Sequence, residues 1–296
     1  MEDQLLFLEN EFYKISVFNP LERTDPHFST RYSHSGYIQQ IVCKPSGREL
    51  LSSPRKEFNP FSGEGFPDEF ETPVGYNDAV LGGRFLKLGV GQQIKREDKP
   101  YTNRDAHEIF SYAETGIRRK EGMLSFSVSD SLGEYAYQYE KTIALQGKDL
   151  LISHTLSNTG NAILDTLWYP HPCLSRGEEK DFIFFECSSD MQPKSDGNLL
   201  LKSHSPRANH SIFRISPCDE LDKGFCFVWV GSDEKNEQAV CLGEKEICHA
   251  KGDYPLREMQ VFVNDRVISP EPKLKLSLGK RKTYCWSTKY LLSCTG

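Results

Sequence analysis

A histidine and a glutamate occupy positions where their side chains could take part in chemistry. His171 lies between Pro170 and Pro172, and proline on both sides restricts its backbone and hence its direction. Glu258 begins an alternating segment in which Gln260, two residues later, points to the same face. An imidazole exchanges protons readily near neutral pH, and a carboxylate can accept or supply one. The alternative is that His171 only binds a backbone carbonyl and that Glu258 faces solvent.

Arg31 and two further histidines are candidates for ligand binding. The planar guanidinium of Arg31 suits a two-point contact with a carboxylate or with sugar hydroxyls, although pairing with Glu22 or Asp25 would explain this residue equally well. His107 lies near predicted strands and could reach a ligand. His154 lies on an alternating strand, where a histidine is more often packed into the core.

A long segment rich in Gly and Pro runs from Pro54 to Gly75 without a periodic pattern. Loops of this length inside a compact domain are usually functional. Its acidic residues Glu64, Asp68 and Glu69 could accept hydrogen bonds from hydroxyl groups of a ligand. The alternative is that these carboxylates are simply solvated.

Alternation of apolar and polar residues dominates the segments that must position these side chains, and no helix of ten or more residues shows a 3.6-residue period. We therefore predict an all-β fold, a large antiparallel β-sandwich that forms a single domain over residues 1–296. Aromatic residues make up 11% of the chain and suit a core between two sheets. The predicted strands are Tyr137–Leu145, Leu150–Leu156, Phe182–Cys187, Ser211–Ile215, Phe225–Val230, Gln238–Leu242, Glu258–Val263 and Lys282–Tyr290.

The charge pattern bears on the kind of partner. The net charge is −6, the charges are interspersed, and no basic block with interleaved aromatic residues occurs. A nucleic-acid partner is therefore not expected.

The N-terminal residues 1–8 combine an acidic start with a short apolar run, unlike the basic start and longer apolar core of a signal peptide. Neither secretion nor membrane attachment is expected, and a cytoplasmic location is predicted. In that setting all nine cysteines are expected to be unpaired thiols. The spacing of Cys241 and Cys248 fits no closed zinc site, so no metal is predicted.

Three stretches in the second half of the chain share their order with a known family. Residues 157–160 (Ser-Asn-Thr-Gly) end a strand and precede residues 168–172 (Trp-Tyr-Pro-His-Pro); residues 256–260 read Leu-Arg-Glu-Met-Gln; and a Pro-rich stretch from residue 270 leads into the last alternating strand. Together they resemble the aldose 1-epimerase (galactose mutarotase) superfamily. The resemblance covers roughly residues 130 to 293.

The resemblance implies a sugar-binding sandwich that interconverts the anomers of a small-molecule carbohydrate without a metal or cofactor. It assigns His171 as the acid that protonates the ring oxygen and Glu258 as the base that takes the proton from the C1 hydroxyl. Gln260 would point into the same cleft.

The N-terminal part of the chain matches this family less clearly. Residues 28–32 (Phe-Ser-Thr-Arg-Tyr) look like its early Gly-Arg segment, which implies that Arg31 binds the sugar. Residues 63–70 and 85–91 look like a bacterial subgroup of uncertain substrate. The earlier sugar-binding histidine of familiar mutarotases is missing, and Arg84 and Lys87 lie about where it is expected. An acidic sugar would suit these two cations.

Two other functions stay open at this point. The protein could hold a sugar without chemistry, or it could be related to polysaccharide lyases or glycosidases, which use similar sandwiches. Hydrolysis normally needs two carboxylates across the glycosidic bond, and a histidine with one carboxylate favours epimerisation or binding. No pattern in the sequence sets the oligomeric state.

Overall fold

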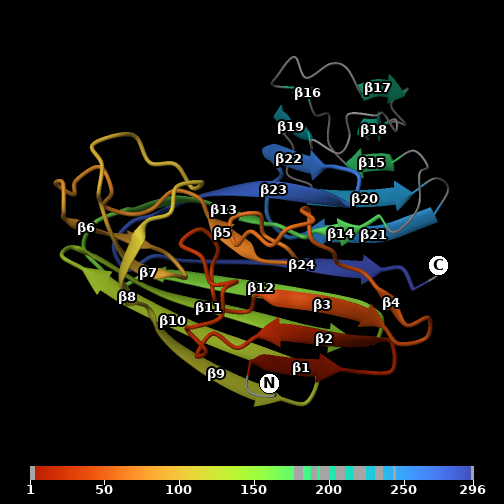
Figure 1. The fold of residues 1–296 in the computed structure, drawn as a ribbon, viewed down its shortest axis with the longest axis horizontal. Coiled ribbons are helices and arrows are strands. Elements are labelled where there is room, and N and C mark those ends of the chain that lie inside the picture. The colour runs from red at the N-terminus through yellow and green to blue at the C-terminus, as the bar shows by residue number, and fades with distance from the viewer. Residues whose placement is uncertain are drawn as a thin grey trace.

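The computed structural model describes residues 4–176, 236–242 and 245–294 in full, together with the backbone of residues 183–187, 192–193, 201–204, 211–215 and 225–230. Every regular element in these ranges is a β-strand, and each pair of neighbouring strands is antiparallel (Figure 1). The predicted all-β antiparallel sandwich is confirmed.

The larger of the two main sheets contains ten of the described strands. Its order is β17-β18-β15-β20-β21-β24-β12-β11-β10-β9. In that order the strands are Leu201–His204, Ser211–Ile215, Ile183–Cys187, Asn236–Leu242, Lys245–Gly252, Thr283–Leu292, Asp149–Asn158, Tyr135–Gln146, Met123–Leu132 and Glu114–Lys120.

The second main sheet faces it and has the order β16-β19-β22-β23-β13-β5, with β14 also paired to β23 (Figure 1). In this order its strands are Gln192–Pro193, Phe225–Val230, Glu258–Val263, Val267–Leu278, Leu164–Pro170, Asp68–Phe70 and, for β14, Leu174–Ser175. This sheet carries most of the residues discussed below.

Two small sheets come from the N-terminal part of the chain. One consists of β1 (Leu5–Glu9), β2 (Tyr13–Phe18), β3 (Ile38–Cys43) and β4 (Arg48–Glu49). The other consists of β6 (Arg84–Lys87), β7 (Gly91–Ile94) and β8 (Glu108–Tyr112), and it lies at the opposite end of the molecule from β4 (Figure 1).

The core follows from the alternation seen in the sequence. Along β12 every second residue is buried, so Leu150, Ile152, His154 and Leu156 point inward. Most of the buried apolar side chains fall into two large clusters, one shared by β1–β3, the ten-stranded sheet and strands β22 and β23 of the second sheet, and one rich in aromatic rings. Burying such side chains contributes about 1.5–3 kcal/mol each.

The eight strands predicted from alternation are all present, with ends that differ by at most two residues. Strand β23 was missed because Pro270 and Pro272 interrupt its pattern. Proline cannot donate to a ladder and is tolerated where one side of a strand is unpaired. That is the case here, since β13 pairs with β23 only from Leu274 onward and β14 only up to Ile268.

The prediction of nine free thiols is wrong at two positions. Cys43, at the end of β3, and Cys294, just after β24, form a disulfide with their Cα atoms 5.5 Å apart. They are separated by 251 residues in sequence, so their proximity depends on how β3 packs beside β24. The described residues also contain no helix long and apolar enough to cross a membrane.

Candidate active site on the seven-stranded sheet

One register places His171 beside Glu271. Trp168 pairs with Leu274 in β13 and β23, and Leu174 pairs with Ile268 in β14 and β23. In both pairs the residue numbers add up to 442, so neither strand has an inserted residue between the two pairs and the register is continuous. It sets His171 opposite Glu271, within the stretch where the prolines interrupt the ladder.

Side chains from four strands share this face, since residues alternate along a strand and align across it. Gln260 pairs with Glu271 and Glu258 pairs with Lys273. On the other side, Tyr169 of β13 pairs with Glu69 of β5. The face is therefore lined by a row of polar side chains: Glu258, Gln260, Glu271, Lys273, Tyr169, His171 and Glu69.

His171 and Glu271 are a buried acid–base pair. Nε2 of His171 lies 3.2 Å from Oε1 of Glu271, and neither residue is more than 5% exposed. Burial lowers the pKa of His171 to about 3 and raises the pKa of Glu271 to about 8. At neutral pH the carboxyl therefore holds the proton and the imidazole is neutral.

Glu69 is buried as deeply but is charged. Arg31 Nε donates to it over 2.6 Å and Asn103 Nδ2 over 2.8 Å, the Tyr169 hydroxyl donates a further hydrogen bond, and Lys87 Nζ lies at 3.5 Å. Burial alone would raise the pKa of Glu69, but the charges of Arg31 and Lys87 and these hydrogen bonds lower it. Glu69 thus fixes the positions of two cations and of Tyr169.

The same two cations hold the surrounding loops. Arg31 also donates to the carbonyl of Phe61 over 2.7 Å, which ties the segment before β5 to the site. Lys87 is fully buried, and burial lowers its pKa to about 8. The ammonium of Lys87 lies 5.2 Å from the centre of the Tyr101 ring. Tyr101 belongs to the same segment as Asn103, two residues later.

Glu258 lies on this face but nearer to solvent. Its side chain is 27% exposed, and Oε1 lies 3.4 Å from Lys273 Nζ, which is also 3.2 Å from Glu71. Gln260 Nε2 donates to Oε2 of Glu271 over 2.6 Å. The carboxylate in contact with His171 is therefore Glu271, while Glu258 lies beside it at the margin of the site.

The structure brings together part of the set expected from the sequence. His171, Arg31, Lys87 and Gln260 converge, with Glu258 at the edge. His107 is one step removed, because its ring stacks on Tyr101 with centroids 5.1 Å apart.

Three expected binding residues lie elsewhere. Asp68 points to the other face of β5, where Oδ2 lies 2.5 Å from Lys141 Nζ. Arg84 is exposed and donates to Gln92. Glu64 binds the ring of His27 over 2.6 Å. Alternation explains the case of Asp68, because consecutive strand residues point to opposite faces.

The sequence did not point to Glu271, Tyr169, Asn103 or Lys273, and it suggested Glu69 as an acceptor for ligand hydroxyls, whereas in the structure Glu69 binds Arg31, Lys87, Asn103 and Tyr169. One signal for Glu271 is in the sequence: it lies between Pro270 and Pro272, as His171 lies between Pro170 and Pro172. Proline on both sides of each residue marks the two places where adjacent strands leave their ladder.

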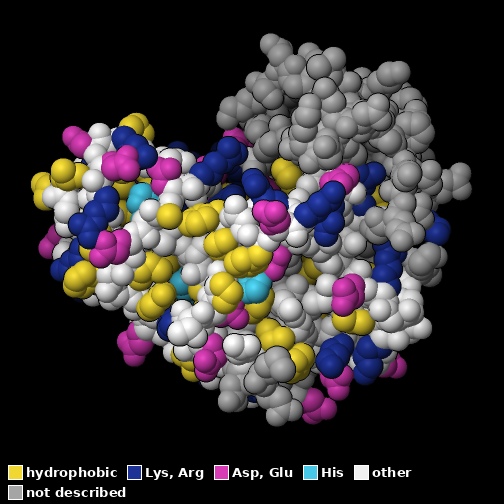
Figure 2. Space-filling view, in the orientation of Figure 1, with side chains coloured by type: hydrophobic (Ala, Val, Ile, Leu, Met, Phe, Trp, Pro, Cys, Tyr) yellow, Lys and Arg dark blue, Asp and Glu magenta, His cyan; other side chains and the backbone are white. Residues whose placement is uncertain are grey.

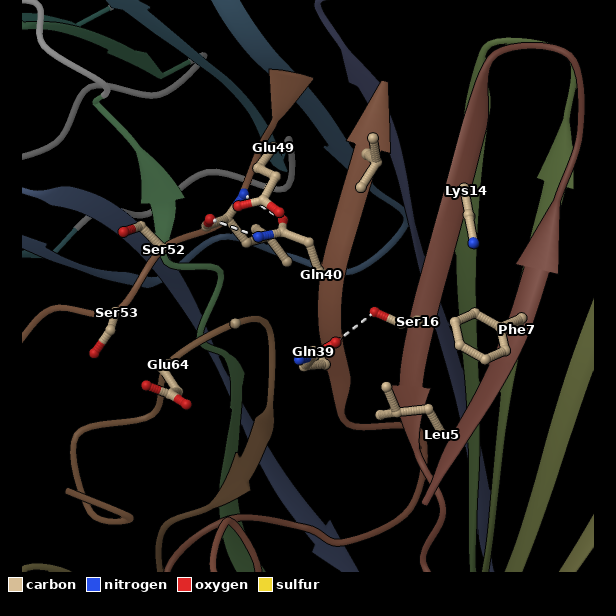
Figure 3. Close-up of a pocket in the computed structure, with 13 residues that line it drawn as sticks. Leu5, Phe7, Lys14, Ser16, Gln39, Gln40, Glu49, Ser52, Ser53 and Glu64 are labelled. Carbon is tan, nitrogen blue, oxygen red and sulfur yellow. Dashed lines mark hydrogen bonds between the residues drawn. The ribbon is translucent and has the colours of Figure 1, made fainter. Parts of the chain in front are cut away.

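Glu64 belongs instead to a groove on the outer face of β1–β4. The groove has a volume of about 480 Å³ and is bounded on one side by the segment that carries Ser52, Ser53 and Glu64 (Figure 3). On the sheet side, Lys14, Ser16 and Gln39 project into it, with Ser16 donating to Gln39 over 2.7 Å. No residue of the row on the seven-stranded sheet lines this groove.

The surface view shows where the charges gather. Basic side chains are grouped with acidic ones at a hollow beside the β6–β8 part of the molecule (Figure 2). In the part of the chain that the structure describes, no three His, Cys, Asp or Glu side chains are arranged to hold a metal ion.

Comparison with solved structures identifies the fold. A galactose mutarotase-like protein from Lactobacillus casei ATCC 334 has a TM-score of 0.62 at 12% identity, covering 98% of this chain and 100% of the other. The GalM/aldose epimerase homologue from C. elegans gives 0.56 at 10% identity, with 99% of each chain covered. The galactose 1-epimerase from Lactobacillus acidophilus NCFM gives 0.55 at 9% identity, covering 98% and 94%. This chain has the galactose mutarotase-like fold.

At these identities the galactose mutarotase-like fold is what the comparison establishes. No protein-family model and no curated protein matches the sequence. Any activity must therefore be argued from the side chains of this chain.

Proposed function

We propose that this protein is an aldose 1-epimerase-like isomerase, in which His171 and Glu271 move the two protons of anomer interconversion. The observation that carries the proposal is the buried contact of His171 Nε2 with Oε1 of Glu271 over 3.2 Å, between two groups whose pKa values burial shifts in opposite directions. An adjacent acid and base with pKa values displaced in opposite directions is an arrangement typical of acid–base catalysis.

The reaction needs an acid and a base that act near one carbon. Glu271 donates its proton to the ring oxygen, and His171 Nε2 takes the proton from the C1 hydroxyl. Because both oxygens are bonded to C1, an acid and a base in contact with each other can reach both. The ring C–O bond breaks as the C1 carbonyl forms, the C1–C2 bond rotates, and reclosure returns both protons to their starting positions.

This assignment differs from the one that the family resemblance implied. There His171 was the acid and Glu258 the base. Here the neutral state of His171 and the proton on Glu271 reverse the role of the histidine. Glu258, partly exposed and paired with Lys273, is proposed to line the sugar site instead.

The charge distribution favours a neutral sugar. Arg31 and Lys87 are both within reach of Glu69, and Lys273 lies between Glu71 and Glu258. Three cations and three carboxylates balance while Glu271 is protonated, so an acidic sugar would bring an unbalanced charge. Of the two cations behind the acidic-sugar prediction, Arg84 is exposed and outside the site, and Lys87 is in the site but already paired with Glu69. Calorimetry with galactose and galacturonate tests this choice, and tighter binding of galacturonate would contradict it.

Binding without catalysis is the second candidate, and one observation favours it. His171 and Glu271 are almost fully buried, so a sugar reaches them only if side chains over the pair move. Partly exposed Gln260 and Glu258 offer a binding surface that needs no such movement.

Polarimetry on a panel of free aldoses, compared with the spontaneous rate, separates the two functions. An epimerase accelerates at least one sugar, and His171→Asn and Glu271→Gln each abolish most of the acceleration. Glu140→Gln, an exposed carboxylate on β11, is the matched control. If the wild-type protein binds a sugar but accelerates the anomer interconversion of none, the second function, binding without catalysis, is supported.

A cytoplasmic location and a single-domain organisation are proposed as before. The Cys43–Cys294 disulfide argues against a cytoplasmic location, because such bonds persist mainly in oxidising compartments. Alkylation of protein isolated from its native source, with and without reductant, tests whether the bond is formed there.

A further inference from the structure

The two ring nitrogens of His171 have different surroundings. Nε2 faces Oε1 of Glu271, and Nδ1 faces the thiol of Cys173, 3.6 Å away. The carbonyl of Gly63 also acts on this ring and favours its protonation. A neutral imidazole carries one proton, and its location decides which nitrogen can serve as a base.

The thiol of Cys173 donates its hydrogen to a backbone carbonyl. Sγ donates to the carbonyl of Gly63 over 2.9 Å. Cys173 is fully buried, and burial raises its pKa well above the ordinary value, so the sulfur keeps its proton. With its hydrogen directed at Gly63, the sulfur presents only lone pairs to Nδ1.

The backbone at Gly63 is shaped for this contact. Gly63 has a φ of +70°, and a Cβ at this position would lie 2.5 Å from the Tyr32 ring. The Tyr32 ring itself packs edge-on against His171, with centroids 5.4 Å apart. Only glycine permits this close approach, which directs the Gly63 carbonyl toward Cys173 and His171.

The other end of the pair is fixed in the same way. Gln260 donates to Oε2 of Glu271 over 2.6 Å, so that oxygen is an acceptor. Oε1 is buried and faces Nε2, and the side chain of Ser269 also acts on this carboxyl as a hydrogen-bond donor that lowers its pKa. The carboxyl proton therefore belongs on Oε1.

We infer that Cys173 is a positioning residue, which together with the Gly63 carbonyl holds the proton of His171 on Nδ1 and leaves Nε2 as a proton acceptor facing Glu271. The consequence is a fixed direction of transfer, from the substrate hydroxyl to Nε2 and from Oε1 of Glu271 to the ring oxygen. The part of the inference that concerns rate rests on the proposed function, and the part that concerns the tautomer does not.

Nitrogen-15 NMR of histidine-labelled protein near pH 6 tests the tautomer, with His171 assigned from the spectrum of His171→Asn. In the wild-type protein we expect a protonated Nδ1 and an unprotonated Nε2. In Cys173→Ala we expect a mixture of tautomers, and in Cys173→Ser, which keeps a donor and an acceptor, the wild-type pattern. Cys248→Ala is the matched control, since it removes a buried thiol from another part of the core.

The same variants give a kinetic readout. Cys173→Ala is expected to lower kcat by about tenfold with little change in KM, as loss of one hydrogen-bonded contact implies, and Cys173→Ser to recover most of it. A protonated Nε2 or a doubly protonated ring in the wild-type protein would overturn the inference even if the enzyme is active. An inactive protein with the expected tautomer would overturn only the proposed function.

Discussion

Asp68 and Glu69 are neighbours on β5, and both carboxylates are fully buried, yet they belong to two different polar clusters. Among the cations of the described residues, Asp68 pairs only with Lys141, and burial raises its pKa despite that charge. Glu69 on the opposite face collects Arg31, Lys87 and two neutral donors, and its pKa is lowered. The difference shows that the number of donors, more than depth, decides whether the pKa of a buried carboxylate is raised or lowered.

The two clusters also differ in their connection to the surface. Around Asp68, the residues Lys141, Tyr139 and His154 are at most 3% exposed, and the His154 ring stacks on Trp286 with centroids 4.9 Å apart. The cluster around Glu69 and His171 continues into partly exposed side chains such as Asn103 and Glu258. We therefore interpret the first as a structural cluster and the second as the candidate active site.

Breaking the structural cluster should have the largest effect. Lys141→Met leaves Asp68 without its cation, and loss of one partner of a buried ion pair typically costs about 3–5 kcal/mol of unfolding free energy. Urea unfolding measures the loss, with Lys251→Met on the surface as the control. An unchanged free energy would show that the Asp68 cluster is not structural.

Removing either member of the His171–Glu271 pair should act on rate and not on stability. His171→Asn and Glu271→Gln keep size and hydrogen bonding but remove proton transfer, so we expect anomer interconversion to slow by about 10²-fold or more. Urea midpoints should stay close to that of the wild type when Glu271→Gln is compared at pH 5 and His171→Asn at pH 7, because neither change buries a new charge and the shifted pKa of the replaced group has little effect on stability there. If either variant loses as much stability as Lys141→Met, the His171–Glu271 pair is structural in the same sense as the Asp68 cluster.

The pH dependence of activity should reflect the two shifted pKa values of His171 and Glu271. Activity needs protonated Glu271 and neutral His171, so it should fall as the pH rises through about 8 and again as it drops toward about 3. The two values belong to the coupled pair, which also faces Arg31 and Lys273.

Stability should change with pH through Glu271 as well. In the folded protein the pKa of Glu271 is about 8, whereas the ordinary pKa of a glutamate is 4.5. The contribution of this group to the free energy of unfolding is therefore fully present below pH 4.5 and is lost as the pH rises toward 8. Glu271→Gln should flatten that slope in urea unfolding between pH 5 and 8. An equal slope in both proteins would mean that the pKa of Glu271 is not raised.

The smallest effect is expected at Glu258. Because this carboxylate is partly exposed and paired with Lys273, Glu258→Gln should change KM by a few-fold and leave kcat nearly unchanged. A loss of kcat as large as that of Glu271→Gln would restore Glu258 as the base, as the family resemblance implied.

The sequence predicted the sandwich because alternation records burial directly, as along β11 and β12. It did not predict the partner of His171, since that depends on a register between strands about a hundred residues apart. Glu258 was chosen from a local motif, and only the pairing of β22 with β23 shows that Glu271 comes between it and His171. The sequence pattern places Asp68 and Glu69 in a loop, because β5 is only three residues long and too short to show alternation.

The Cys43–Cys294 bond turns most of this polypeptide into a covalent ring. A single backbone cut anywhere between these two residues leaves one molecule, because the two pieces remain joined through sulfur. Under limited proteolysis the protein should therefore keep its full mass on a non-reducing gel after one cleavage and separate into fragments only when a reductant is added. The segment from residue 44 to residue 293, which includes every residue of the candidate active site except Arg31 and Tyr32, lies within that ring.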